Sequence, residues 1–322
     1  MKISYVIPVL NEEESLQQLY KEIRAANPSE EYEIIFIDDG SRDKSYALLS
    51  DLAACDSSVL LVKFRRNFGK AAALQVGFQI ASGELVFTLD ADLQDDPAEI
   101  PNFIEKLNQG YDLVSGWKQK RHDPLYKTLP SRLFNYITAK SFRLPLKDFN
   151  CGFKLYRRSV VKELCLYGEM HRYIPVLANA LGYRIGQIAV HHRKRQFGTS
   201  KYGWERYLRG FFDLLTVKMV TQYVKSPLYL FGRIGLISCG LGTLLTGYLA
   251  FMKLFYGSPL SNRPLLLLGI LMILGGLQFF SMGLISELLI NRSQSGGNHI
   301  SISNFQNISE KNLSRYLPES IE

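Results

Sequence analysis

The chain has 322 residues and a formal net charge of +8 at pH 7, and this charge is unevenly distributed. Residues 1–114 carry 10 Lys or Arg against 20 Asp or Glu, whereas residues 115–225 carry 22 against 6. The four cysteines have no spacing typical of a metal site or a redox pair, so free thiols in a reducing cytoplasm account for them. The first apolar stretch is short and acidic residues follow it directly, so we expect no secretory signal peptide.

The first quarter of the chain repeats a strand, a turn and a helix at intervals of roughly 30 residues. Residues 2–15 predict an apolar strand and then a helix, with Asn11 and Glu14 at capping-box spacing. Residues 32–45 predict a second strand that ends in two aspartates, and residues 65–77 predict a glycine turn before a helix. Acidic or glycine turns after each strand indicate a nucleotide-binding α/β domain with a parallel sheet.

An Asp-x-Asp pair follows the next predicted strand, in the sequence ELVFTLDADLQDDP at residues 84–97. Ligands of open α/β sheets bind beyond the carboxyl ends of the strands, where Asp90 and Asp92 would lie. Residues two apart in an extended segment point to the same side, so both carboxylates can face one Mg²⁺ or Mn²⁺ ion and its diphosphate. An acidic turn that caps a helix near Pro97 is the alternative interpretation.

Two apolar runs in the last third of the chain are long enough to cross a membrane. Residues 234–252 and 265–286 contain no charged side chain. A hairpin of two spans would place both outer ends on one side, and the positive-inside rule puts that side in the cytoplasm. The polar tail after Arg292 lacks periodicity, so we expect a weakly ordered extension.

Two amphipathic segments precede the apolar runs. Residues 125–144 alternate leucines and isoleucine with basic side chains, which fits either a helix in the membrane interface or ordinary core packing. Residues 204–220 lie next to the first run and favour the interfacial position. The basic region therefore adjoins the membrane, where a phosphate-bearing lipid would be found, and we expect no nucleic-acid partner.

Six motifs in this order resemble the family-2 glycosyltransferases of the GT-A fold. They are VIPVLNEE, IDDGSRD, RNFGKAAALQVGF, DADLQDDP, DFNCGFKLYRR and RRKRQFGTSKYG. The resemblance is to the polyprenyl-phosphate branch, which includes dolichyl-phosphate mannose synthase and the bactoprenol glucosyltransferases, and it spans roughly residues 3–290. The QxxRW segment of processive polysaccharide synthases is absent from the sequence.

The resemblance implies a site with several groups of residues. The nucleotide would contact Pro8, Glu12, Asp38, Asp39, Lys70 and Asp90, and the metal ligands would be Asp90, Asp92 and Gln94. Arg193, Arg195, Ser200 and Lys201 would bind the donor phosphates, whereas Lys118, Arg121, Lys127, Ser131 and Arg132 are candidates for the acceptor phosphate. Asp148 would join Asp92 as a catalytic residue, either as a base or by orienting basic side chains.

The expected reaction transfers one sugar, with inversion, from a nucleotide sugar to undecaprenyl or another polyprenyl phosphate at the cytoplasmic leaflet. UDP-glucose is the favoured donor, with UDP-GlcNAc and GDP-mannose as alternatives. A phosphate acceptor is already anionic at neutral pH and needs no strong base. A hydroxyl lipid acceptor or a non-catalytic membrane subunit would be the rival functions.

The resemblance also implies an arrangement along the chain and an assembly. We expect a catalytic GT-A domain at residues 1–203, a juxtamembrane helix at 204–226, two transmembrane helices within 227–290 (about 228–252 and 265–287) and a cytoplasmic tail at 291–322. A homotetramer is the expected assembly.

Overall fold

The computed structural model describes residues 1–119, 125–193, 213–219, 221, 227–257, 264–293 and 302–306. Its contacts divide the chain into two units. One comprises Met1–Val217 and Gly297–Glu322, and the other comprises Lys218–Gly296. The first unit therefore contains residues from both ends of the chain.

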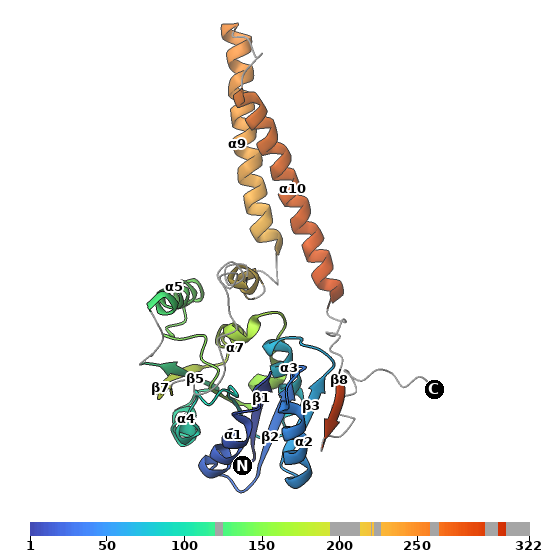
Figure 1. The fold of residues 1–322 in the computed structure, drawn as a ribbon. Helices are drawn as coiled ribbons and strands as arrows, with labels where there is room; N and C mark the ends of the chain where they lie inside the picture. Colours follow the sequence, from blue (N-terminus) through green and yellow to red (C-terminus); the bar gives the residue numbers. More distant parts are fainter. Residues whose placement is uncertain are drawn as a thin grey trace, which may run out of the picture. The chain divides into compact units, whose positions relative to one another are not determined.

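The first unit is built on one mixed sheet with the strand order β7-β5-β6-β4-β1-β2-β3-β8 (Figure 1). Most neighbours along the sheet are parallel, but β6 runs antiparallel to β4 and β5, and β8 runs antiparallel to β3. The strands are β1 (Ile3–Val9), β2 (Tyr32–Asp38), β3 (Val59–Phe64), β4 (Leu85–Thr88), β5 (Leu113–Lys118), β6 (Lys154–Arg157), β7 (Ile185–Val190) and β8 (Ile302–Gln306). The predicted α/β fold is confirmed, but the sheet is mixed rather than wholly parallel.

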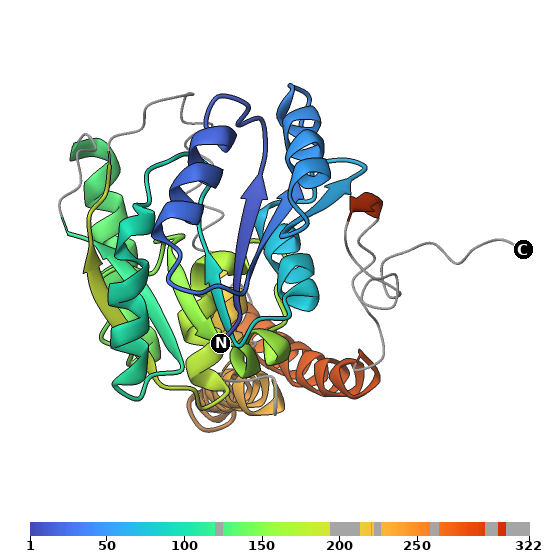
Figure 2. The same cartoon turned by 90° about the horizontal axis from the view of Figure 1, so that it is seen from below.

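Helices cover both faces of this sheet (Figure 2). The α-helices of the unit are α1 (Leu16–Ala26), α2 (Ser45–Cys55), α3 (Lys70–Ile80), α4 (Ile100–Asn108), α5 (Leu125–Phe142), α6 (Arg158–Glu163) and α7 (Ile174–Ala180), with short 3₁₀ turns η1 (Pro97–Glu99) and η2 (Met170–Tyr173). Successive side chains of a strand point to opposite faces. Tyr5 of β1 lies in one core cluster with Leu19 of α1, whereas a Cβ on Gly77 of α3 would meet Val6 Cγ1 at 2.2 Å. Hence α1 and α3 lie on opposite faces.

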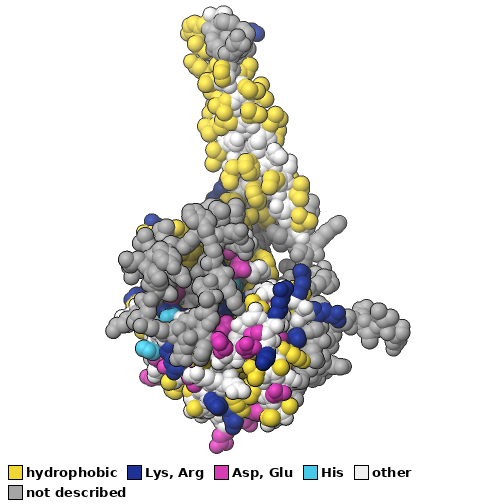
Figure 3. Space-filling view, viewed as in Figure 1, with side chains coloured by type: hydrophobic (Ala, Val, Ile, Leu, Met, Phe, Trp, Pro, Cys, Tyr) yellow, Lys and Arg dark blue, Asp and Glu magenta, His cyan; other side chains and the backbone are white. Residues whose placement is uncertain are grey.

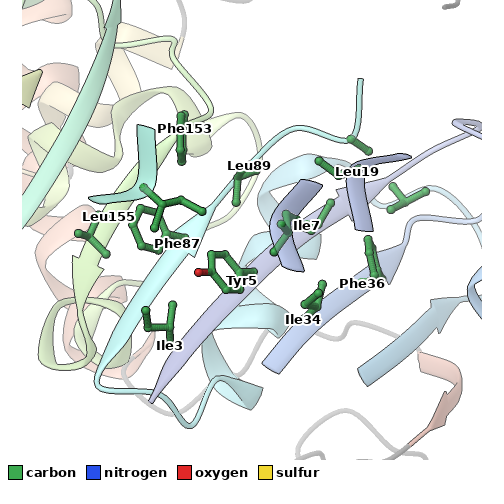
Figure 4. Close-up of a cluster of buried hydrophobic side chains, with 14 of the residues drawn as sticks. Ile3, Tyr5, Ile7, Leu19, Ile34, Phe36, Phe87, Leu89, Phe153 and Leu155 are labelled. Atoms are coloured by element: carbon green, nitrogen blue, oxygen red, sulfur yellow. The ribbon is translucent and has the colours of Figure 1, made fainter. Parts of the chain in front are cut away.

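The core beneath α1 joins residues from strands far apart in the sequence (Figure 4). Tyr5, Phe36 and Phe87 are fully buried there, and the rings of Tyr5 and Phe87 stack with centroids 5.6 Å apart. Burying one such side chain contributes about 1.5–3 kcal/mol to stability. This core holds the carboxyl ends of β1, β2 and β4 in register, and the polar residues of the site follow those ends.

Two expectations about local structure are wrong. Asn11 does not cap a helix, because α1 begins at Leu16; Asn11 has φ of 52° and its Oδ1 accepts a hydrogen bond from the Arg42 amide at 2.8 Å. Asn11 therefore joins the loop after β1 to the loop after β2 by a hydrogen bond, and it does not cap α1. The tail, which was expected to be a weakly ordered extension, contains the strand β8, which pairs with β3 from Leu61 to Phe64. Its partner strand lies more than 200 residues away, so no local pattern reveals it.

The second unit is an antiparallel pair of long helices, α9 (Pro227–Tyr256) and α10 (Pro264–Ser293), which confirms the predicted apolar pair. Hydrophobic side chains are spread along the face of the two helices that Figure 3 shows. Glycines allow close packing between them: a Cβ on Gly235 would lie 2.7 Å from the Gly276 carbonyl, and one on Gly242 would lie 2.7 Å from that of Gly269. Both helices are long and apolar enough to cross a membrane, and few residues of their most apolar stretches are buried.

Candidate active site

Several predicted site residues that the structure describes lie where β1, β2 and β4 end. These strands are parallel, so the turns that follow them lie along one edge of the sheet. The antiparallel strand β6 begins at the same edge, because Lys154 pairs in register with Thr88 at the end of β4. Residues from two distant parts of the sequence, 84–97 and 148–154, therefore meet there.

Asp38 and Asp39 close the end of β2. The Asp38 side chain is fully buried; its Oδ1 accepts a hydrogen bond from the Ser41 amide at 2.9 Å, whereas its Oδ2 has no hydrogen-bond partner among the described residues. Asp39 accepts hydrogen bonds from the amides of Phe68 (2.6 Å) and Gly69 (2.9 Å). Burial raises the pKa of Asp39 to about 6, and the neighbouring Asp38 adds to this effect. Asp38 thus offers a buried acceptor to a ligand.

The loops after β1 and β2 are joined by hydrogen bonds. The Glu12 amide donates to Ser45 Oγ at 2.9 Å, and Glu13 Oε2 accepts from the Lys44 amide at 2.8 Å. Pro8 lies opposite Ile37 in the strand register. The structure therefore brings Pro8 and Glu12 close to the aspartates at the end of β2, and their contact with a nucleotide stays a prediction.

Asp90 is held by a basic partner and by a glycine. Its Oδ1 forms an ion pair with Lys70 Nζ, at the first residue of α3. A Cβ on Gly152 would lie only 2.6 Å from Asp90 Oδ2, so the carboxylate packs directly over the glycine backbone. Burial would raise the pKa of Asp90, but Lys70, Lys118 and Lys154 together hold it well below its usual range. Asp90 is therefore an anion at neutral pH.

Asp92 and Gln94 lie in a tight turn beyond Asp90. Asp92 is 9% exposed, and its Oδ1 accepts a hydrogen bond from the Gln94 amide at 3.3 Å. Leu93 between them has φ of 59°, a left-handed conformation that is costly for a leucine. Backbone strain of this kind persists where surrounding contacts enforce it, and it is concentrated at functional sites.

Lys154 is a buried basic residue of the site that the sequence analysis did not single out. It is 2% exposed, and its Nζ donates to the Cys151 carbonyl oxygen. Burial lowers the pKa of Lys154, whereas the nearby Asp148 and Asp90 raise it. The only available signal was its place in the DFNCGFK motif, because the antiparallel insertion of β6 cannot be predicted from local periodicity.

Asp148 is completely buried in the turn before β6. Its Oδ1 accepts a hydrogen bond from the Asn150 amide at 3.1 Å, and its carbonyl oxygen accepts from Gln187 Nε2 at 3.2 Å. The negative charges of Asp148 and Asp90 both raise the pKa of Lys154. Asp148 is therefore linked to the Asp-x-Asp pair through a lysine.

Two cations that were expected to bind phosphates, Lys118 and Arg193, contact carboxylates in this structure. Lys118 Nζ lies 3.5 Å from Asp95 Oδ1, and Arg193 forms ion pairs with Glu22 (2.6 Å) and Asp96 (2.7 Å). Arg121, Arg195, Ser200 and Lys201 lie outside the described residues, and the side chains of Lys127, Ser131 and Arg132 in α5 are not described.

The described residues contain no group of three or more His, Cys, Asp or Glu side chains able to hold a metal ion. Mg²⁺ usually binds through one or two carboxylates plus substrate phosphates rather than in an all-protein cage. Hard oxygen donors lie at the strand ends, in the carboxylates of Asp90 and Asp92 and the side-chain amide of Gln94. These residues fit a divalent ion that is shared with a donor diphosphate.

A mixed sheet with an acidic pair at its carboxyl edge is the arrangement expected of the GT-A fold. Solved structures support this fold: a glucosyl-3-phosphoglycerate synthase from Mycobacterium tuberculosis, crystallised with Mn²⁺, uridine diphosphate and phosphoglyceric acid, has a TM-score of 0.52 at 19% identity and covers 68% of this chain and 78% of its own. The predicted GT-A fold is thereby confirmed.

Sequence comparisons define the family. The family model described as glycosyl transferase family 2 matches residues 4–165. A dodecaprenyl-phosphate galacturonate synthase from Rhizobium johnstonii is 36% identical over 90% of this chain and 88% of its own. An undecaprenyl-phosphate 4-deoxy-4-formamido-L-arabinose transferase from Pseudomonas fluorescens is 40% identical over 89% of this chain and 84% of its own. The chain belongs to glycosyltransferase family 2 and is a glycosyltransferase.

Proposed function

We propose that this enzyme transfers a single sugar from a nucleotide sugar to a polyprenyl phosphate at a membrane surface. The observation that carries the proposal is the joint presence of an Asp-x-Asp site on a GT-A sheet and an apolar helix pair in one chain. Two relatives that match about nine-tenths of the chain are named for transfer to dodecaprenyl and undecaprenyl phosphate.

The sugar is a separate part of the proposal. The names of the two relatives specify galacturonate and 4-deoxy-4-formamido-L-arabinose, and neither supports the glucose that the sequence analysis favoured. Donor candidates are therefore the nucleotide derivatives of these two sugars, together with UDP-glucose, UDP-GlcNAc and GDP-mannose. All of them share the diphosphate that the site would bind.

The nucleotide end of the donor would lie against the ends of β1 and β2. Asp38 Oδ2 is a fully buried acceptor that lacks a partner among the described residues, so a donor group of the nucleoside would satisfy it. Asp92, Asp90 and Gln94 would hold Mg²⁺ or Mn²⁺. Such an ion, when bound, neutralises the diphosphate and stabilises it as a leaving group.

The acceptor sets what the protein side chains must do. A phosphate monoester has a second pKa near 6, so its oxygen is anionic at neutral pH and can attack the sugar without a base. The remaining tasks are to align this oxygen behind the anomeric carbon and to balance charge. Single displacement would invert the configuration. Asp148 would orient Lys154 rather than remove a proton, because the acceptor oxygen is already anionic.

The strand β8 supports a two-span hairpin. The chain leaves the first unit before α9 and returns to it after α10, because residues 302–306 pair with β3. If α9 crosses the bilayer, α10 must cross back so that β8 can pair with β3. The start of α9 and the end of α10 then lie on the same side of the membrane. The positive-inside rule makes that side the cytoplasm.

An apolar surface on α5 supports contact with the membrane. Tyr136 is 63% exposed and Ile137 is 40% exposed, whereas Asn135 and Thr138 of the same helix are buried. Exposed aromatic and aliphatic side chains interspersed with basic residues are typical of interfacial helices. Assembly into a homo-oligomer, a tetramer by the family resemblance, stays a prediction that the mass of the detergent-solubilised protein would test.

The proposal is tested by incubating membranes that contain the protein with undecaprenyl phosphate and each radiolabelled nucleotide sugar. We expect one sugar to appear in a lipid product that mild acid cleaves, as it does a glycosyl phosphate. Transfer to diacylglycerol or ceramide, but not to undecaprenyl phosphate, would favour the hydroxyl-lipid rival. Failure with every lipid and every donor would favour the non-catalytic subunit.

A further inference from the structure

The sequence DADLQDDP contains a second acidic pair, Asp95 and Asp96, whose side chains make contacts different from those of Asp90 and Asp92. Asp95 is 2% exposed; its Oδ2 accepts a hydrogen bond from the Asp90 amide at 3.4 Å, and its Oδ1 lies 3.5 Å from Lys118 Nζ on β5. Asp95 therefore links the end of the loop to Asp90, its first residue, and also joins the loop to β5 of the sheet.

Asp96 attaches the other end of the loop to two further elements. Its Oδ1 accepts hydrogen bonds from the Ala98 amide at 3.0 Å, at the start of η1, and from Arg193 Nη2 at 2.7 Å. Arg193 Nη1 donates to Glu22 Oε2 of α1 at 2.6 Å. One guanidinium thus joins α1, the loop and the segment after β7.

The backbone reinforces these side-chain contacts. The Arg193 amide donates to the Gln94 carbonyl oxygen at 3.0 Å, and Asp95 forms an antiparallel bridge with His192. Gln94 is consequently fixed by a direct hydrogen bond, and Asp92 lies between it and Asp90, which Lys70 holds. The segment that would hold the metal has anchors on both sides and little freedom to move.

We propose that Asp95 and Asp96, with Lys118, Arg193 and Glu22, are positioning residues that hold Asp92 and Gln94 in their donor-binding geometry. This inference rests on the proposed function, and it gives Lys118 and Arg193 a role other than binding phosphate. Residues that orient metal ligands from behind affect affinity without touching the ligand, and their substitution typically costs 10- to 100-fold.

The alternative, that Arg193 binds the donor phosphates directly, makes the opposite prediction for its partners. If Arg193 is a phosphate ligand, removing Glu22 or Asp96 frees its guanidinium, and donor affinity stays the same or increases. If Arg193 is an anchor, removing either carboxylate weakens donor binding just as removing the arginine does. The carboxylate variants therefore separate the two roles.

The experiment measures binding of UDP and GDP to the full-length protein in detergent by calorimetry, with and without Mn²⁺. The variants are Asp96→Ala, Glu22→Ala, Arg193→Ala and the double variant Asp96→Ala/Arg193→Ala. We expect each single variant to weaken Mn²⁺-dependent binding roughly 10- to 100-fold and to leave Mn²⁺-free binding unchanged. The double variant should lose less affinity than the sum of the Asp96→Ala and Arg193→Ala losses, because both changes remove the shared Asp96–Arg193 contact. Asp96→Asn, which keeps an acceptor oxygen, should be intermediate.

The matched control is Glu33→Gln, which breaks the ion pair between the buried Glu33 and the partly exposed Lys2 (2.7 Å), at the amino end of β2. It should lower the melting temperature while nucleotide binding stays at the parental level, so loss of stability alone cannot explain weaker binding. Parental or tighter binding by Asp96→Ala and Glu22→Ala, beside weaker binding by Arg193→Ala, would overturn the inference. A parent that binds neither nucleotide in Mn²⁺ would overturn the proposed function and this inference with it.

Discussion

Position 152 has no room for a side chain. The Cβ of an alanine there would lie 2.6 Å from Asp90 Oδ2, and Thr88 Oγ1 fixes the backbone by donating to the Gly152 carbonyl oxygen at 2.7 Å. Gly152→Ala should therefore displace the Asp90 carboxylate, with an overpacking cost of about 1–3 kcal/mol. We expect sugar transfer to fall roughly tenfold or more, measured as the initial rate at saturating acceptor.

The control for Gly152→Ala is Gly247→Ala in α9, where a new Cβ meets nothing within 4 Å. That variant should keep the parental rate and melting temperature. Parental transfer by Gly152→Ala would show that the Asp90 carboxylate can move without consequence.

Asp92→Asn tests the metal assignment at the other carboxylate. The amide keeps the size of the side chain but removes the charge that a hard cation requires. We expect Mn²⁺-dependent nucleotide binding and transfer to be lost while the melting temperature changes little. Asp51→Asn, on the exposed side of α2, serves as the matched control. Full activity of the parent in excess EDTA would contradict the assignment.

Asp39 gives stability a defined pH dependence. Its pKa is about 6 in the folded protein because it is buried, against an ordinary value of 3.8. Between these values the folded state holds a proton on Asp39 that the unfolded chain has lost, so the contribution of Asp39 to stability is greatest below about pH 4 and decreases as pH rises through about 6. The full effect is up to roughly 3 kcal/mol.

The measurement compares melting temperatures of the parent and Asp39→Asn from pH 4 to 8. The parental value, relative to the variant, should decrease up to about pH 6 to 7 and then become constant. A difference that increases with pH would mean that hydrogen bonds from the Phe68 and Gly69 amides outweigh burial.

Among the elements, β8 protects the edge strand β3. Without it, β3 would expose unpaired amides and carbonyls to other chains. Truncation after residue 298 should therefore lower the melting temperature, by roughly 2–4 °C for each kcal/mol lost, and promote self-association. Truncation after residue 310 keeps β8 and is the control. Both properties are measurable by thermal unfolding and size-exclusion chromatography, and equal behaviour of the two truncations would contradict a protective role.

Elements with a strong local pattern could be predicted from the sequence. β1, β2 and β4 are apolar runs followed by acidic turns, and the order of strand and helix fixes their parallel pairing. β6 and β8 could not be predicted in the same way, because both are antiparallel strands whose partners lie far away in the sequence. The loop contacts of Asn11 and Arg193 were missed for a related reason, since each residue has its partner on another element.

For the whole molecule, we expect α9 and α10 to keep the enzyme near its lipid acceptor, whereas the first unit carries out the transfer. Because β8 follows α10, a simple truncation before α9 would also remove a strand of the sheet. Replacement of Lys218–Gly296 by a flexible Gly/Ser linker keeps that strand. We expect this variant to bind nucleotide normally but to glycosylate a bilayer-embedded acceptor much more slowly, because the local concentration of acceptor falls.

A short-chain acceptor in solution provides the control for this replacement, since the parent and the linker variant should use it at similar rates. Equal rates on the bilayer-embedded acceptor would show that the helices only determine where the protein resides.

The position of β8 in the chain also sets an order of events during synthesis. The ribosome makes β1 to β7 first, then the helix pair, and the last strand emerges only after both helices have left the ribosome. With α9 and α10 in the bilayer as proposed, a chain that inserts only one of them would leave residues 302–306 on the far side of the membrane, and β3 would stay open. The catalytic sheet is then completed only in chains that have inserted both helices. Chains that insert incorrectly do not reach the complete fold of the enzyme.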